Sequence, residues 1–249
     1  MLLLAGDPAP AGAEGSLAAP SDYGIGILAC GASHAAIDVS CLGGSLKWLG
    51  VVRIYHEPRE EPASVLGTLA LDLRRYDSDS FEMIAADGAR EALASVEVVY
   101  EAAALIILER SGDWLRTSHG WISGRSIGLG GQTVFLPWRD VLGYQITGAK
   151  AQGSNDIGWF YSVTAQPLYD APGGIIVADD AAFGRARDGD EKSHDFLVLE
   201  RKDNWIKVVV DETDDVCSGQ EIRSSGITGW IRLTDEQGHP LVYWRTRGC

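Results

Sequence analysis

The sequence is short of positive charge and contains no long apolar run. Lys and Arg together number 21 against 35 Asp and Glu, so the formal net charge is −14 for 249 residues. A nucleic acid or an anionic membrane surface needs clustered basic side chains to neutralise its phosphates. We therefore expect neither as a partner. The absence of any run of about 18 apolar residues also predicts no membrane span.

Motifs for metal binding are lacking as well. The five histidines (His34, His56, His119, His194 and His239) are scattered along the chain, and no C-x-x-C pair occurs. Zinc sites usually place such ligands at short, characteristic spacings. The acidic clusters lack the Asp-x-Asp-x-Asp-Gly order that a calcium loop requires. We therefore expect no metal and no cofactor.

Catalytic motifs are equally scarce. Ser33, His34 and Asp38 invite a triad interpretation, but no G-x-S-x-G elbow accompanies them. The glycine cluster at 124–131 (GRSIGLGG) lacks the Gly-Lys-Ser or Gly-Lys-Thr end of a phosphate loop, and a strand is expected to follow it. A linker fits this cluster better. We expect that the chain is not an enzyme.

What the sequence has instead is material for short strands. Hydrophobic residues make up 45%, and there are 30 Gly, eight Trp and eight Tyr. Short apolar runs alternate with Gly, Pro and charged turns, which is typical of antiparallel sheets. Expected strands are a hairpin at 24–30 and 36–41, then 49–55, 65–69, 96–100, 104–109 and 114–117. No long apolar stripe with helical spacing is found, so we predict an all-β fold with little helix.

An internal repeat organises the chain. Three sequence elements occur twice, in the same order: 54–58 (IYHEP) and 168–172 (LYDAP), 107–116 (ILERSGDWLR) and 198–207 (VLERKDNWIK), and 120–122 and 229–231 (both GWI). The loops between these elements differ in length, as surface loops of duplicated units do. The repeat predicts two diverged copies of one unit. Short strands of this kind bury one face by curling into a small barrel.

These motifs resemble the bacterial SH3-like (SH3b) family. Its members open with an apolar strand and a Pro-bearing loop, continue with a Gly-x-Trp-apolar-basic hairpin and close with Gly-Trp-apolar. The resemblance covers roughly residues 49–125 and 162–233, with a long insert in each copy. It implies two small SH3-like barrels in tandem. We expect a disulfide-bearing hairpin on their N-terminal side, from the spacing of Cys30 and Cys41.

The tryptophans fall into two groups. Trp114, Trp121, Trp205 and Trp230 recur in both copies, and we expect them to be largely buried structural residues. An aromatic groove for an extended peptide is the alternative role for these four. The remaining ones, Trp48, Trp138, Trp159 and Trp244, lie outside the matched elements and are expected between the two barrels.

The predicted organisation has four parts. Residues 1–21 form a flexible leader or a signal remnant, because 1–6 (MLLLAG) resembles the end of a signal sequence. Residues 22–125 form the first SH3-like barrel with its N-terminal hairpin. Residues 126–160 form a linker with inter-barrel strands, and 161–249 form the second barrel. The spaced cysteines indicate export, so we expect a periplasmic or extracellular location.

The resemblance implies a binding or spacing module rather than an enzyme. We expect a non-catalytic exported scaffold that binds a peptide or protein of the cell envelope. The candidate ligand residues are Tyr55 and Glu57 in one Pro-bearing loop and Tyr169 and Asp170 in the other, because an aromatic ring beside a carboxylate suits an amine-bearing peptide. The alternative is the targeting or regulatory part of a cell-wall hydrolase whose catalytic domain is absent.

Four cysteines, Cys30, Cys41, Cys217 and Cys249, form one pair near each end of the chain. Three pairings are possible in principle, and the local one, Cys30–Cys41 and Cys217–Cys249, closes the shortest loops. We predict these two disulfides in protein purified from an oxidising compartment. Thiol titration of the unreduced, denatured protein should then detect no free thiol, whereas four free thiols would contradict the prediction.

Overall fold

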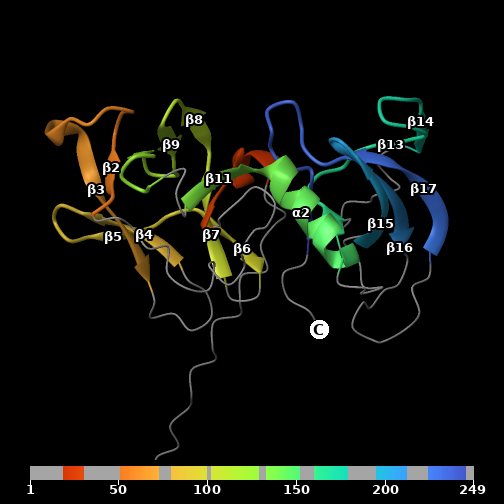
Figure 1. Cartoon of the computed structure of the whole chain (residues 1–249), viewed down its shortest axis with the longest axis horizontal. Coiled ribbons are helices and arrows are strands. Elements are labelled where there is room, and N and C mark those ends of the chain that lie inside the picture. The colour runs from red at the N-terminus through yellow and green to blue at the C-terminus, as the bar shows by residue number, and fades with distance from the viewer. Residues whose placement is uncertain are drawn as a thin grey trace, which may run out of the picture.

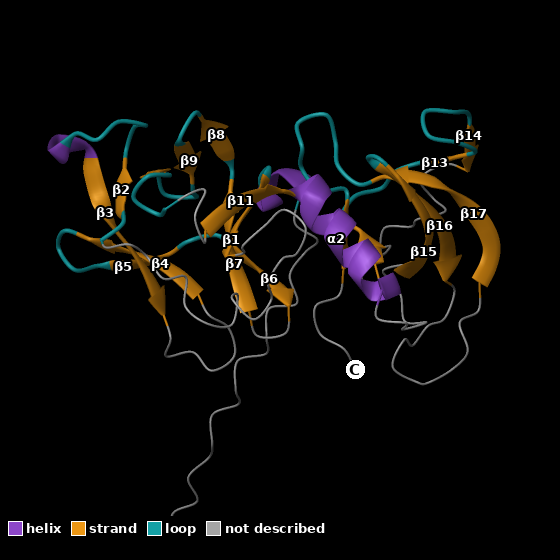
Figure 2. Ribbon diagram, viewed as in Figure 1, coloured by secondary structure: helices purple, strands orange, loops and turns teal. Residues whose placement is uncertain are grey.

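In the computed structural model the chain is mainly β-sheet, which confirms the all-β prediction (Figure 1, Figure 2). The structure describes residues 19–30, 51–72, 80–99, 102–128, 133–151, 160–178, 195–211 and 224–244. Within these segments there is one α-helix, α2 (Trp138–Ala151), and two 3₁₀ turns, η1 (Pro20–Tyr23) and η2 (Pro62–Ser64). All strand pairing in them is antiparallel.

The described strands form three sheets. The four-stranded sheet has the order β11-β1-β7-β6, built from β1 (Gly26–Cys30), β6 (Ser95–Val99), β7 (Ala102–Ile107) and β11 (Thr133–Pro137). The first seven-stranded sheet has the order β5-β4-β3-β2-β10-β9-β8, built from β2 (Arg53–Tyr55), β3 (Val65–Asp72), β4 (Ser80–Ala85), β5 (Arg90–Ala92), β8 (Glu109–Ser111), β9 (Trp114–Arg116) and β10 (Trp121–Ser123). The second has the order β14-β13-β17-β16-β15-β12-β18, built from β12 (Phe160–Ser162), β13 (Leu168–Tyr169), β14 (Ile176–Ala178), β15 (Asp195–Lys202), β16 (Trp205–Asp211), β17 (Ser224–Arg232) and β18 (Val242–Trp244).

The four-stranded sheet lies between the other two and is buried on both faces (Figure 1). Successive residues of a strand point to opposite faces. Ile27 enters the core shared with α2 and the second seven-stranded sheet, whereas Leu28 enters the core of the first; both are 0% exposed. Ala104 and Leu105 of β7 divide between the same two cores. One sheet therefore joins both halves of the molecule.

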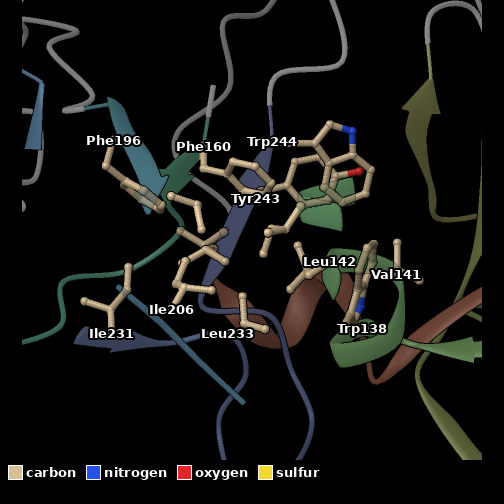
Figure 3. Packing of buried hydrophobic residues seen from close by; sticks show 14 of the residues in the cluster. Trp138, Val141, Leu142, Phe160, Phe196, Ile206, Ile231, Leu233, Tyr243 and Trp244 are labelled. Atoms are coloured by element: carbon tan, nitrogen blue, oxygen red, sulfur yellow. The ribbon is translucent and has the colours of Figure 1, made fainter. Parts of the chain in front are cut away.

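Helix α2 packs its apolar stripe into the second core. Trp138, Val141, Leu142 and Ile146 are buried, at the spacing of one helix face. The Trp138 indole contacts Tyr243 and Trp244, with ring centroids 5.7 and 6.4 Å apart, and Figure 3 shows these side chains with the rest of the cluster. Trp48 and Trp159 lie outside the described residues.

The segment 126–160, interpreted from the sequence as a linker with strands, contains the strand β11 and also the helix α2, which the sequence did not predict. The helix was missed because its buried stripe consists of only four residues. The exposed face of the helix carries the polar residues Arg139, Asp140 and Thr147. Gly143 also lowers the helical propensity of the segment. A Cβ at Gly143 would meet the Arg201 guanidinium, so the glycine accommodates a side chain from the second sheet.

The predicted repeat is present in the strand pairing. Five neighbouring strands of the first seven-stranded sheet, β3-β2-β10-β9-β8, correspond in the same order to five of the second, β14-β13-β17-β16-β15. Each set of five strands is one repeated unit. Trp121 lies opposite Tyr55 and Arg116, and its counterpart Trp230 lies opposite Tyr169 and Lys207. Trp114 and Trp205 likewise each open the second strand of a hairpin. The repeated Trp residues therefore occupy equivalent registers.

Two irregularities recur in both units. The pairing of β2 with β3 shifts between Ile54 and Tyr55, and that of β13 with β14 shifts between Leu168 and Tyr169. The two hairpin turns also contain an equivalent residue with positive φ, Gly112 at 59° in one and Asp203 at 52° in the other. Shared irregularities of this kind are strong evidence that one unit was duplicated, because bulges are characteristic of a fold.

Other expectations need correction or lie outside the described residues. Of the four repeated Trp residues only Trp230 is buried, and the other three are partly exposed. Strand β1 is paired with β11 and β7, while the predicted hairpin partner at 36–41 lies outside the described residues. So do Cys41, Cys217, Cys249 and the side chain of Cys30. Each unit forms an open row of five strands in the described pairing, without a bond between its two end strands.

Candidate functional site

The two Pro-bearing loops leave equivalent strands and close in the same way. In the first unit the amide of His56 donates to the carbonyl of Ser64 at 2.8 Å, and in the second the amide of Asp170 donates to Ile175 at 2.9 Å. The first loop is the longer of the two and contains η2, whereas the second turns at Gly173 and Gly174. The extra length gives the first loop a different surface.

The first loop encloses an open hollow of ≈ 480 Å³. Its lining residues are His56, Glu57, Arg59, Glu61, Ala63, Ser64, Val65 and Leu66. Arg59 is paired with Glu57 at 2.9 Å and with Glu61 at 3.4 Å, and all three side chains are exposed. Exposed pairs of this kind contribute roughly 0–1 kcal/mol each, so a cationic ligand can compete with Arg59 for the two carboxylates.

A Tyr–Trp pair supports the base of each loop. Tyr55 meets Trp114 with ring centroids 5.5 Å apart and planes at 89°, and Tyr169 meets Trp205 at 5.2 Å and 85°. Edge-to-face contacts of this geometry are favourable beyond the area they bury. The glycine of each Gly-Trp-Ile motif lets the chain at β10 or β17 approach the neighbouring strand closely. A Cβ at Gly120 would lie 2.5 Å from the Tyr55 carbonyl oxygen. The repeated motif is thus a structural element of the loop base.

The structure places the four predicted ligand residues in different surroundings: one lines the hollow, and three take part in contacts that hold the loops. Glu57 lines the hollow. Tyr55 is only 5% exposed and packs beneath Trp114, so it does not present its ring beside Glu57. Tyr169 is partly buried against Trp205, and the Asp170 carboxylate accepts the amide of Ile175 at 2.8 Å. Asp170 therefore helps to hold its own loop.

Sequence reasoning missed one polar cluster, Ser118, His119 and Glu91. The Ser118 hydroxyl oxygen lies 2.9 Å from Nδ1 of His119, and Nε2 of His119 lies 3.1 Å from a Glu91 carboxylate oxygen. Glu91 comes from β5, which sequence spacing could not connect to the turn at 117–120. The Ser-His-Asp group considered from the sequence, at 33, 34 and 38, lies outside the described residues.

The hydrogen bonds of the Ser118–His119–Glu91 cluster connect the turn at 117–120 to β5 and to the β5–β6 connection. A serine nucleophile needs backbone donors that can stabilise an oxyanion. The amides of His119 and Gly120 both donate to the Thr117 hydroxyl, at 3.4 and 3.3 Å, and Ser118 Oγ accepts the amide of Ala94 at 3.0 Å. These bonds fix the turn against the β5–β6 connection.

Comparisons with known proteins do not assign the chain. No family model matches it, and neither the curated proteins nor the solved structures contain a match. The described segments contain no group of three or more His, Cys, Asp or Glu side chains placed to hold a metal ion. None of the helices described is both long and apolar enough to cross a membrane.

Ser118→Ala tests the structural assignment of the polar cluster. The variant loses bonds to Ala94 and His119, so the free energy of unfolding should fall by about 1–2 kcal/mol in urea titration. The wild-type protein should not react with a fluorophosphonate probe. Covalent labelling of the wild type that disappears in Ser118→Ala would contradict the assignment and indicate a nucleophilic serine.

Proposed function

We propose that this chain is a non-catalytic binding or scaffolding protein of the cell envelope, located in the periplasm or outside the cell. In this proposal each repeated unit is a diverged SH3-like barrel. The ligand is a peptide-like envelope component with a free amine, and its site is the hollow in the first Pro-bearing loop.

The observation that carries the proposal is the chemistry of that hollow. Glu57 and Glu61 present carboxylates to it, and the apolar parts of Val65 and Leu66 line the same space. The loop also contains Glu60, so it carries three carboxylates and one guanidinium, that of Arg59. An amine can pair with the carboxylates while the peptide stem contacts the apolar wall.

The repeat supports a binding role in a second way. The Tyr55–Trp114 contact and the Gly120 approach fix the base of the loop, so the hollow lies on a rigid support. Binding residues are commonly found on loops held by such a scaffold. The second unit keeps the support, in Tyr169, Trp205 and Gly229, but has a shorter loop. Duplication followed by divergence of one loop is consistent with a ligand site in the first unit.

The test uses two probes: isolated cell wall, and a labelled synthetic peptide with two free lysine amines. Both should bind the wild type, and the double variant Glu57→Gln with Glu61→Gln should bind the peptide about 10-fold more weakly, because two charge-assisted contacts are lost. Glu60→Gln is the matched control, since Glu60 belongs to the same loop and does not line the hollow. Acetylating the lysine amines should weaken binding as much as the double variant does.

Two results would contradict the proposal. The first is the absence of saturable binding of either probe by the wild type. The second is equal peptide affinity in the wild type, the double variant and Glu60→Gln, which would place the peptide away from the hollow.

A further inference from the structure

The outer edge of the second seven-stranded sheet is apolar and uncovered. Ile175, Ile176 and Val177 are 75%, 55% and 54% exposed, and they are consecutive along the chain. Among the described strands, β14 is the last of its sheet. Adjacent strand residues point to opposite faces, so β14 is open on both faces as well as at its edge. An exposed apolar strand at the edge of a sheet is a template for pairing with another strand.

The first unit shows how the equivalent edge is covered. By strand register, Val65 is the counterpart of Ile176, and Gly67 is the counterpart of Ala178. Ser64, Val65 and Leu66 are partly buried there, beneath the longer loop. From Gly67 onward β3 also pairs with β4, whose alternating Phe81 and Met83 are buried. In the first unit an antiparallel strand with alternating apolar residues therefore pairs along the same side of the sheet, from the counterpart of Ala178 onward.

The backbone of β14 is oriented to bond a further strand. The carbonyl of Ile175 accepts the backbone amide of Asp170 at 2.9 Å, and the amide of Ile175 donates to the Asp170 side-chain carboxylate at 2.8 Å. Backbone bonding directions alternate along a strand of an antiparallel pair, so the N–H and C=O of Ile176 point toward the outer edge. These groups are the ones that strand addition uses.

We propose that β14 binds an extended peptide segment, which adds to the sheet as an antiparallel strand with alternating apolar residues and a net positive charge. The positive charge follows from the net charge of −14 and from Asp170 at the start of the edge. The same negative charge disfavours a second copy of this chain as the occupant. The site is separate from the hollow of the first unit and goes beyond the proposed function.

The probe is a labelled, end-blocked heptapeptide, KVTVTVK, followed by fluorescence anisotropy with the full-length protein. Ile176→Pro removes the outward N–H, and Ile176→Lys keeps it but adds repelling charge; each should weaken binding about 10-fold or more. Val51→Lys is the matched control, because Val51 is 73% exposed and lies in the first half of the chain. It should bind as the wild type does. The acidic peptide EVTVTVE should bind at least 10-fold more weakly.

Three results would overturn the proposal. One is the absence of saturable binding of KVTVTVK to the wild type. Another is unchanged affinity in both Ile176 variants. The third is self-association in sedimentation equilibrium that Ile176→Lys abolishes, which would make a second copy the occupant. Because KVTVTVK has lysine amines that the hollow would also bind, its affinity is measured in the Glu57→Gln with Glu61→Gln background, with and without each Ile176 substitution. Binding that remains in this background and is lost with the Ile176 substitutions belongs to the edge, so failure of the hollow and failure of this edge are distinguishable.

Discussion

Burial of the four-stranded sheet on both faces is the constraint on which the rest of the structure depends. Its strands are apolar at consecutive positions, such as Ile27 and Leu28, because neither face meets water. Each face supplies one wall of a core, and each seven-stranded sheet supplies the other wall. The sheet also sets the start of α2, because Pro137 at the end of β11 is followed directly by Trp138 of the helix.

Equivalent arginines connect both repeated units to this central segment. Arg110 donates to the carbonyl of Gly112 in its own hairpin turn, at 3.2 Å, and lies over the Phe135 ring of β11, at 5.5 Å. Arg201 donates to the carbonyl of Asp203, at 3.4 Å, and to that of Arg139 in α2, at 3.3 Å. The same residue of each copy thus holds a turn and reaches the β11–α2 segment.

The sequence predicted features that depend on local pattern and missed those that depend on distant contacts. The strand expected at 104–109 overlaps β7, which ends at Ile107, and the repeat at Trp114 and Trp205 was predicted, because apolar runs and motif spacing are local signals. Helix α2 was missed because its stripe is short and its burial comes from the second sheet. The Ser118–Glu91 cluster and the burial of Tyr55 under Trp114 join segments far apart in the chain. Glu57 and Asp170 are exposed, because a loop carboxylate needs no tertiary contact to reach solvent.

Hydrogen exchange on the variant Ile27→Ala tests most directly whether one sheet couples both halves. Ile27 lies in the core of the second seven-stranded sheet, so the substitution should destabilise that core by roughly 2–5 kcal/mol. If the four-stranded sheet is shared, amides of β2, β9 and β10 in the first seven-stranded sheet should lose protection together with those of β13, β16 and β17. Loss of protection confined to the second seven-stranded sheet would contradict the account, because the two halves would then unfold independently.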